Sequence, residues 1–382
     1  MNQHWIAAWG CPIAHINRES AQWMKDTTVR FNILMTVPGS SVKLHFSNLF
    51  NPESSTIARA SIGVCLEESS FDLNRFATVT FNGGAESGTM EAGGAITSDP
   101  IELDFEAGET LTVSLYFKDF TRLLTGHRNT GSKFIQRWSA NGDCTHTPDL
   151  PLCEYNDAVA YPFIHTIESY SPENCYSIVA YGDSITAQSW PDRLSRRLLA
   201  MGRKDVAIIR KAISGSRVLR EYPCDLYRHY GPRGEERFER EVLFPGVKKV
   251  FILHGINDII HPVEGGSIFR PITDQPTAEE LIEGLEYYIE TAHKNGIRVF
   301  MSPILPFEGW RTYNEEKEQI REAVNYWIYR AAPIEGVLPF ETAILNPENP
   351  IAMDPAFDSG DHLHPSDNGA QAMADCIPEE FI

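Results

Sequence analysis

The stretch YSIVAYGDSIT, Tyr176 to Thr186, decides the fold of the C-terminal half of this 382-residue chain. Its first six residues form an apolar run that is typical of a buried strand. The string Gly-Asp-Ser-Ile-Thr ends that run. A serine at such a strand end can project its hydroxyl into a cleft while its own N–H stays free, as a nucleophilic serine requires. The stretch therefore predicts that Ser184 is a nucleophile.

Strands and helices alternate from about residue 175 to the C-terminus. The expected helices are amphipathic, and in the first of them Trp190, Leu194 and Leu198 share one face. Such alternation indicates the α/β class, with a mostly parallel sheet covered by helices on both faces. The expected strands are 177–181, 205–211, 249–254, 297–301 and 337–340, and the expected helices are 190–201, 277–295 and 314–330.

The N-terminal part of the chain has a different sequence pattern. Short runs rich in Val, Ile, Thr and Phe alternate with turn residues, and Leu111–Phe117 shows clear period-two alternation. Regularly spaced short strands without intervening helices predict an all-β sandwich or jelly roll. We therefore expect two domains, an N-terminal β-sandwich over 1–165 and a catalytic domain over 166–382. The expected strands of the first are 29–37, 42–46, 57–66, 77–81 and 111–117.

Four polar strings in the second half each follow an expected strand or precede the final helix. Active sites in open parallel sheets collect at the carboxyl ends of the strands, so these strings are expected to meet at one edge. They supply a serine, a glycine, an asparagine and a histidine from separate elements. The strings are Gly182–Thr186, Ala212–Ser216, Gly255–Asp258 and Asp361–Pro365.

Each of these residues suits a role in acyl transfer. A hydroxyl is a poor nucleophile at neutral pH, so Ser184 needs a base, and His364 is the preferred candidate. Asp361 precedes it by three residues and can bind the second ring nitrogen, which fixes the tautomer. His362 is the competing choice of base.

A negative oxygen that develops during acyl transfer needs donors that are already in place. The candidates are the N–H of Ser184, the N–H of Gly215 and the side-chain amide of Asn257. Gly215 suits this role because a residue without Cβ lets the backbone approach a substrate. The Gly-x-Ser-x-Gly elbow of α/β-hydrolases does not occur around Ser184.

The four strings resemble the motif blocks of the GDSL, or SGNH, hydrolase superfamily. The resemblance implies a three-layer α/β/α fold, serine esterase activity without a cofactor, and the residue roles given above. Lys211, where Asn is expected, and His254 depart from the family pattern. The matching blocks are Gly182-Asp-Ser-Ile185, Ser214-Gly-Ser216, Gly255-Ile-Asn-Asp258 and Asp361-His-Leu-His-Pro365.

The resemblance also extends upstream of these blocks. Val42–Asn48, Val79–Gly83 and Thr112–Tyr116 are similar to the β-rich N-terminal part of a two-domain bacterial subgroup. This similarity implies that the β-rich region is the first domain of such a protein.

Residues beside the motif blocks are candidates for substrate contact. Asp183, Thr186 and Ile256 flank the blocks, and Trp310 follows the fourth expected strand at the same sheet edge. Asp183 has a second interpretation, because an aspartate at this position can brace its own loop. Trp310 has one too, because its ring can pack the loop that carries it.

The net charge and the cysteine content indicate which classes of binding partner and which cellular compartment to expect. With 33 Lys and Arg against 52 Asp and Glu, the net charge is −19, which disfavours nucleic acid and anionic membrane surfaces. No apolar run approaches the ~20 residues that insertion into a membrane needs. Seven scattered cysteines and a start without a secretory leader predict a cytoplasmic protein, or a secreted one if a leader was removed.

A metal site is not expected. Cys144, His146 and Cys153 lie close together, but no second close pair completes a zinc ligand set. We therefore expect neither a metal nor a cofactor.

These features predict a hydrolase of carboxylic esters that works through an acyl intermediate on Ser184. The expected substrate is a small-molecule or saccharide ester with a short acyl group such as acetyl, because nothing indicates a long apolar tunnel. Two alternatives remain on the same site, a lysophospholipase or lipase and an acyltransferase. A third is an inactive carbohydrate-binding protein, and the sequence does not indicate the oligomeric state.

Overall fold

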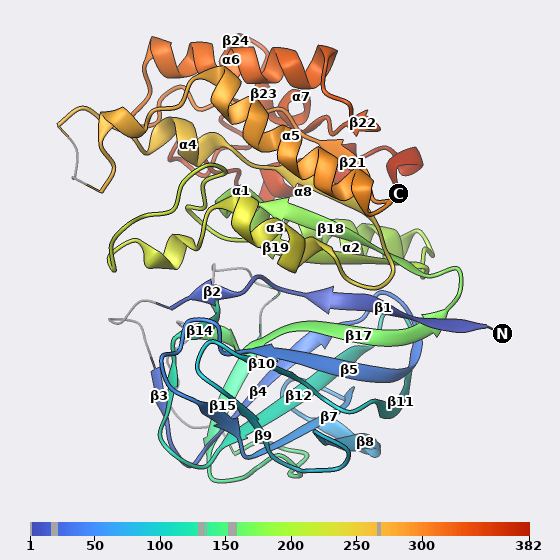
Figure 1. The fold of residues 1–382 in the computed structure, drawn as a ribbon. Coiled ribbons are helices and arrows are strands. Elements are labelled where there is room, and N and C mark those ends of the chain that lie inside the picture. The colour runs from blue at the N-terminus through green and yellow to red at the C-terminus, as the bar shows by residue number, and fades with distance from the viewer. Residues whose placement is uncertain (1, 17–21, 129–133, 135, 152–158, 266–268) are drawn as a thin grey trace. The chain divides into compact units, whose positions relative to one another are not determined.

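The computed structural model describes residues 2–16, 22–128, 134, 136–151, 159–265 and 269–382 (Figure 1). The chain divides into two compact units. One comprises Met1–Ser177 with Leu198–Ile209, and the other comprises Ile178–Arg197 with Arg210–Ile382. Among the helices in the described ranges, none combines the length and the apolar character that crossing a membrane requires.

The N-terminal unit is built from two five-stranded antiparallel sheets. The first has the order β1-β17-β5-β10, with β11 also paired to β5: β1 (Gln3–Gly10), β17 (Ile164–Pro172), β5 (Gly39–Ser47), β10 (Ala95–Thr97) and β11 (Ile101–Phe105). The second has the order β15-β4-β12-β7-β8: β15 (Arg137–Asn141), β4 (Thr27–Leu34), β12 (Thr110–Phe117), β7 (Arg59–Cys65) and β8 (Phe71–Val79).

Shorter strand pairs complete this unit. They form the sheets β13-β3, β16-β14-β2 and β6-β9. Their bounds are β2 (Ala14–His15), β3 (Gln22–Met24), β6 (Ser55–Ile57), β9 (Gly88–Met90), β13 (Thr121–Leu123), β14 (Thr125–Arg128) and β16 (Val159–Pro162).

One apolar core holds the two large sheets together. Phe31 and Leu115 of the second sheet belong to the same buried cluster as Val42, Leu44 and Ile167 of the first. Burial of aromatic and branched side chains from both sheets is the main stabilising term of such a sandwich. The expectation of a strand-rich, all-β N-terminal region is confirmed.

The all-β unit extends beyond the boundary expected at residue 165. β17 crosses that point, and its residues pair with β1 on one side and with β5 on the other. Because β17 lies in the interior of the first sheet, this sheet continues to Pro172.

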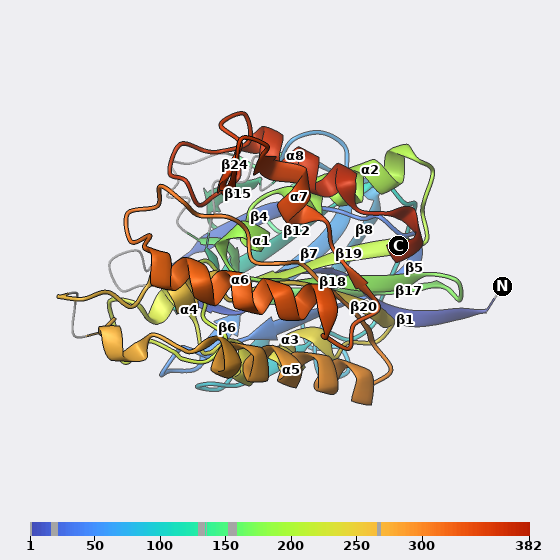
Figure 2. The same ribbon diagram turned by 90° about the horizontal axis from the view of Figure 1, so that it is seen from above.

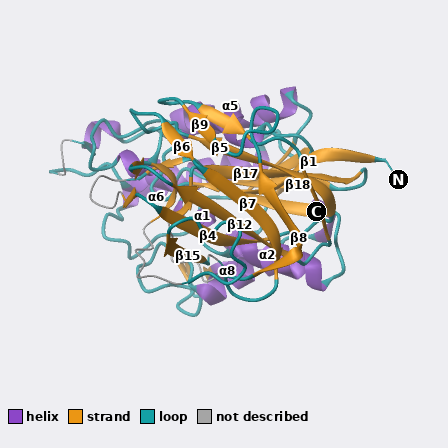
Figure 3. Cartoon of the chain, turned by 90° about the horizontal axis from the view of Figure 1, so that it is seen from below, coloured by secondary structure: helices purple, strands orange, loops and turns teal. Residues whose placement is uncertain are grey.

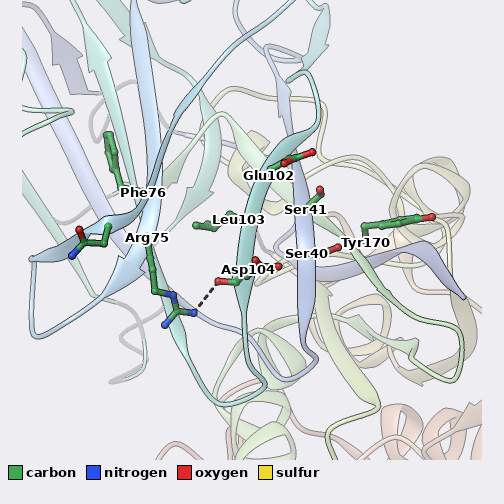
Figure 4. A pocket seen from close by; sticks show the side chains of 9 residues that line it. Ser40, Ser41, Arg75, Phe76, Glu102, Leu103, Asp104 and Tyr170 are labelled. Carbon is green, nitrogen blue, oxygen red and sulfur yellow. Dashed lines mark hydrogen bonds between the residues drawn. The ribbon is translucent and has the colours of Figure 1, made fainter. Parts of the chain in front are cut away.

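An open hollow lies on the same unit (Figure 4). It measures about 700 Å³, and Ser40, Glu102, Asp104 and Tyr170 are among the residues that line it. Arg75 fixes one wall, because its guanidinium donates to the carbonyl of Asp104 at 2.8 Å and binds both carboxylate oxygens of Glu109. The guanidinium of Arg75 is therefore paired within the protein, and the carboxylates of Glu102 and Asp104 line the same hollow.

The second half contains a five-stranded parallel sheet in the order β19-β18-β20-β21-β22. Three of its strands, including one at the edge, are almost entirely buried, which explains why they appear in the sequence as mostly apolar runs. The strands are β18 (Tyr176–Gly182), β19 (Val206–Ala212), β20 (Val247–Leu253), β21 (Arg298–Met301) and β22 (Gly336–Val337). A separate pair is formed by β23 (Leu345–Asn346) and β24 (Asn349–Met353).

Helices cover both faces of this sheet, as expected for three layers. Helices α3 and α5 lie on one side of the strands, and α2 and α8 lie on the other (Figures 2 and 3). The helices are α1 (Ser184–Ala187), α2 (Trp190–Ala200), α3 (Gly234–Val242), α4 (Ile256–Ile260), α5 (Ala278–Lys294), α6 (Glu315–Arg330), α7 (Phe340–Ile344) and α8 (Asp367–Cys376). The predicted α/β/α architecture is confirmed.

The strand order determines where a site can form. The chain passes from β18 to β19 on one side and then to β20 on the other side of β18. Such a reversal opens a crevice at the carboxyl end of the central strand, where ligands bind in open α/β sheets. Ser184 follows the carboxyl end of β18 by two residues.

Candidate active site

The turn from β18 into α1 presents Ser184. The carboxylate of Asp183 accepts the N–H of Ile185 at 3.1 Å, so Asp183 caps the helix that Ser184 begins. Gly182 is needed because β20 passes close by, and a Cβ at this position would lie 2.1 Å from the carbonyl oxygen of Leu253. The local sequence therefore places a serine at the first helical position, where it is partly exposed.

A chain of hydrogen bonds connects Ser184, His364 and Asp361. The distance from Ser184 Oγ to His364 Nε2 is 2.8 Å, and His364 Nδ1 lies 2.6 Å from Asp361 Oδ2. When Nδ1–H donates to the carboxylate, Nε2 is left to accept the proton of the serine hydroxyl. The arrangement has the geometry of a serine nucleophile with a base and a group that orients the base.

The backbone keeps Asp361 in place. Its Oδ1 accepts the N–H of Leu363 at 3.0 Å and that of His364 at 2.8 Å. Burial alone would raise the pKa of Asp361, but the hydrogen bonds from His364 and Leu363 outweigh it and lower the pKa below its usual value. Asp361 therefore stays ionised while it orients the imidazole.

His362, the competing base, is bound elsewhere. Its Nδ1 lies 2.7 Å from Asp358 Oδ2, and its backbone N–H donates to the same carboxylate at 3.0 Å. The φ angle of His362 is +63°, in the left-handed region that residues other than glycine seldom adopt. The structure brings His364, and not His362, to Ser184.

Gly215 lies in a tight turn beside the end of β18. The N–H of Ser216 donates to the carbonyl of Ile213 at 3.1 Å, and Gly215 has a φ of +82°, which together are typical of a type II turn. The N–H of Ile213 donates to the carbonyl of Gly182 at 3.2 Å, so the turn is anchored next to the serine loop. A Cβ on Gly215 would meet the ring of Tyr230 at 2.1 Å.

The side chain of Asn257 is fixed to the same turn. Its Nδ2 donates to the carbonyl of Ser216 at 3.0 Å. One N–H of the amide is used in this bond, and the second is left for another acceptor. The three candidate donors thus come from loops that direct hydrogen bonds join to one another.

One buried charged residue that sequence reasoning missed braces these loops. Arg237 of α3 donates to the carbonyl of Gly182 at 2.7 Å and to the carbonyl of Lys211 at 3.2 Å, and it pairs with Glu241 at 2.5 Å. The signal available was an Arg and a Glu four residues apart on the apolar side of an amphipathic helix, next to Phe238.

Asp258 ties the third motif loop to the second. Its carboxylate accepts the N–H of Val218 at 2.8 Å and that of Leu219 at 3.0 Å. Burial raises its pKa to about 6 and that of Asp183 to about 7. Both carboxyls are fully enclosed, and their bonds to backbone N–H groups are structural.

The two departures from the family pattern have structural explanations. His254 is buried, its Nδ1 lies 3.0 Å from the hydroxyl of Tyr288, and its Nε2 lies 3.1 Å from the carbonyl of Ser216. Burial and the neighbouring Arg237 lower the pKa of His254 well below the usual value, so it stays neutral. The ammonium of Lys211 lies 5.0 Å from the centre of the Phe244 ring.

The four candidate substrate-contact residues separate into two groups. Asp183, Thr186 and Ile256 are buried in the interior. Trp310 is partly exposed, and its ring meets that of His364 edge to face, with 6.4 Å between centroids. The guanidinium of Arg311 lies over the Trp310 ring, 4.7 Å from the ring centre. Of these four side chains, that of Trp310 is the partly exposed one.

The described residues were also compared with the zinc site considered from the sequence. Within the described ranges, no three His, Cys, Asp or Glu side chains are grouped as a metal site requires. Of the three residues considered as zinc ligands from the sequence, Cys153 lies outside the described residues.

The fold and the site together define a hydrolase of the three-layer α/β/α kind. The sequence profile of the GDSL-like Lipase/Acylhydrolase family matches residues 180–372, which is half of the chain. The protein belongs to this family. The match covers all the strands of the parallel sheet except the start of β18, and it includes all four motif strings.

Solved structures of similar proteins were also found. A GDSL-like lipase from Bacteroides thetaiotaomicron is 20% identical, with 54% of this chain and 87% of that chain covered and a TM-score of 0.39. An acetylxylan esterase from Geobacillus stearothermophilus is 18% identical, with 53% and 91% covered and a TM-score of 0.40. No curated protein matches the chain.

Proposed function

We propose that this hydrolase cleaves carboxylic esters with short acyl groups through an acyl intermediate on Ser184. The observation that carries the proposal is the unbroken chain from Ser184 Oγ through the imidazole of His364 to the carboxylate of Asp361, at 2.8 and 2.6 Å. Membership of an acylhydrolase family supports it.

The first half-reaction transfers the acyl group to the enzyme. Ser184 Oγ attacks the carbonyl carbon while His364 Nε2 takes the hydroxyl proton, and the carbonyl oxygen becomes negative. We assign the stabilisation of that oxygen to the N–H groups of Ser184 and Gly215 and to the second N–H of the Asn257 amide. His364 then gives its proton to the departing alcohol as the ester C–O bond breaks.

Water completes the reaction. His364 takes a proton from the water, the hydroxide oxygen bonds to the acyl carbon, and Ser184 leaves with the proton returned by His364. Asp361 stabilises the protonated imidazole in both halves and stays ionised throughout.

The alcohol part of the substrate is proposed to be a saccharide. Because His364 delivers the proton to the leaving alcohol, this group must lie beside the imidazole. Trp310 meets that imidazole edge to face and is partly exposed, so it offers an aromatic surface on the alcohol side. Sugar rings present C–H groups that pack well on such surfaces.

The primary test replaces the nucleophile. Ser184→Ala is expected to lower kcat for p-nitrophenyl acetate by about 10⁴ or more, because attack then depends on water alone. Ser54→Ala, an exposed serine of the N-terminal unit, is the matched control and should match the wild type. Turnover that is unchanged in Ser184→Ala sinks the proposal.

The substrate panel separates the alternatives. Acetate release from acetylated oligosaccharides that exceeds hydrolysis of octanoyl esters supports the saccharide esterase. Faster hydrolysis of octanoyl than of acetyl esters indicates a lipase, and transfer to an added alcohol indicates an acyltransferase. A fluorophosphonate probe that leaves Ser184 unlabelled, together with saccharide binding, indicates an inactive binding protein.

A further inference from the structure

A cluster of three aromatic side chains, Tyr222, Tyr230 and His261, packs against the glycine turn. Tyr222 and His261 are almost completely buried, and Tyr230 stacks on His261 with ring centroids 5.6 Å apart. The hydroxyl of Tyr222 contacts His261 Nδ1 and donates to the carbonyl of Gly215 at 3.4 Å. These three residues carry no family motif, and the steps above do not use them.

The direction of the Gly215 N–H depends on how this glycine is held. Glycine adopts φ angles of either sign with similar ease, so the residue type alone does not select the conformation at +82°. The next carbonyl along the chain, that of Ser216, is held by Asn257 and His254. In the described part of the chain, the donor to the Gly215 carbonyl itself is Tyr222.

The protonation of Tyr222 and His261 determines which of the two donates the hydrogen bond between them. The hydroxyl of Tyr222 has one proton, so when it donates to Gly215 the proton between Tyr222 and His261 must come from Nδ1. Burial, with Arg270 and Arg217 nearby, lowers the pKa of His261 to about 3, and burial raises the pKa of Tyr222 above its usual value. Both groups therefore stay uncharged around neutral pH.

We propose that Tyr222 is a positioning residue, whose hydroxyl, fixed by His261, holds the Gly215 carbonyl so that the N–H of the same glycine faces the reacting oxygen. The inference rests on the proposed function, because it assigns a supporting role to a donor in that reaction. It predicts that the loss of one hydroxyl weakens stabilisation of the transition state and leaves binding of the ester nearly unchanged.

The test compares two tyrosines of the same cluster. Tyr222→Phe removes only the hydroxyl, and we expect kcat for p-nitrophenyl acetate to fall about tenfold, with KM within about twofold. This is part of the roughly 10²–10³ that loss of a whole oxyanion donor costs. A boronic acid, which forms a tetrahedral adduct with the serine oxygen, should bind more weakly by the same factor. Tyr230→Phe keeps the ring against Gly215 and should match the wild type.

Variants at His261 test the second link. The side-chain amide of Asn can place a donor near the position of Nδ1, so His261→Asn is expected to retain most of the wild-type kcat. His261→Ala removes the donor and is expected to behave like Tyr222→Phe. Titration with a fluorophosphonate counts the active molecules in each preparation, and the thermal midpoint checks folding.

The outcomes are distinguishable from failure of the proposed function. If Tyr222→Phe keeps the wild-type kcat and boronate affinity, or if Tyr222→Phe and Tyr230→Phe lose activity equally, the positioning role is wrong. The esterase proposal then still stands, provided that the probe labels Ser184. If Ser184 is not labelled in the wild type, both proposals fall.

Discussion

Two histidines on one loop, His362 and His364, show how local contacts separate residues of the same type. His364 has Asp361 at one ring nitrogen and Ser184 at the other. His362 has its Nδ1 against Asp358 and a left-handed backbone, and Gly309 leaves room for its ring, because a Cβ there would lie 2.8 Å from it. Spacing in the sequence favours one residue only weakly, whereas the contacts distinguish them clearly.

These contacts predict opposite results for the same substitution. His364→Asn should lower kcat by about 10⁴ or more, because Ser184 loses its base. His362→Asn should keep kcat within about twofold, because Asn tolerates a positive φ and the His362 side chain, which is 54% exposed, contacts Asp358 and not Ser184. Kinetics with p-nitrophenyl acetate measure both variants. Equal losses in the two would contradict the assignment of the base.

The buried carboxyl of Asp183 makes stability depend on pH. Its pKa is about 7 in the folded protein against roughly 3.9 when unfolded, so the folded state binds the extra proton between these values. The stability that protonation of Asp183 contributes to the folded state is fully present below about pH 4 and is lost as the pH rises through 7.

Asp183→Asn keeps the acceptor for the N–H of Ile185 and removes the titration. Relative to this variant, the wild type should lose at least about 1 kcal/mol between pH 5 and pH 8. Urea unfolding at both pH values measures the difference. A difference that is the same at pH 5 and pH 8 would show that Asp183 does not titrate in this range.

At the scale of the element, hydrogen bonds at the helix ends contribute to the stability of the helices that cover the sheet. α5 begins with a reciprocal cap, in which Thr277 accepts the N–H of Glu280 and the Glu280 carboxylate accepts the N–H of Thr277. The helix carries Tyr288, whose ring stacks on Phe238 of α3 at 4.7 Å. The cap therefore stabilises a helix that packs behind the motif loops.

Loss of this cap should weaken folding without changing the chemistry. Thr277→Ala is expected to lower the free energy of unfolding by about 1 kcal/mol, with kcat unchanged. Thr342→Ala, whose hydroxyl donates to the carbonyl of Pro339 in an exposed position, is the matched control and should cost less than about 0.5 kcal/mol. The urea midpoints of the two variants provide the comparison, and equal shifts would argue against the cap.

The elements also show which parts of the structure could be predicted from the sequence. The strands that precede Ser184, Gly215 and Asn257 were predictable, because buried parallel strands give apolar runs that motif loops directly follow. Arg237 was not, because an arginine in a charged helix usually indicates a solvated face. Tyr222 and His261 were also missed, since the fold alone brings together residues 39 positions apart.

For the whole molecule, the net charge of −19 governs the approach of charged substrates. A field of one sign repels ligands of the same sign over about 30 Å at 0.01 M salt, and over about 8 Å at 0.15 M. Neutral esters are not subject to this repulsion. The charge balance therefore favours uncharged substrates most strongly at low ionic strength.

Salt should accordingly change the hydrolysis of anionic esters only. For mono-p-nitrophenyl succinate, kcat/KM is expected to rise severalfold between about 0.01 and 0.3 M salt, while the value for p-nitrophenyl acetate stays nearly constant. Steady-state assays across this range test it. A fall for the anionic ester would show that a local cation such as Arg311, and not the net charge, governs its approach.

The guanidinium of Arg237 bears on how the specificity of this enzyme can be redesigned. One enclosed side chain supports the carbonyl before the serine loop and the carbonyl before the glycine turn, so a random change there disturbs several loops at once. Mutant libraries that seek new substrates should leave position 237 untouched. Their diversity is better drawn from the accessible rim at Trp310 and Arg311, where an altered side chain changes what is admitted while the scaffold beneath stays intact.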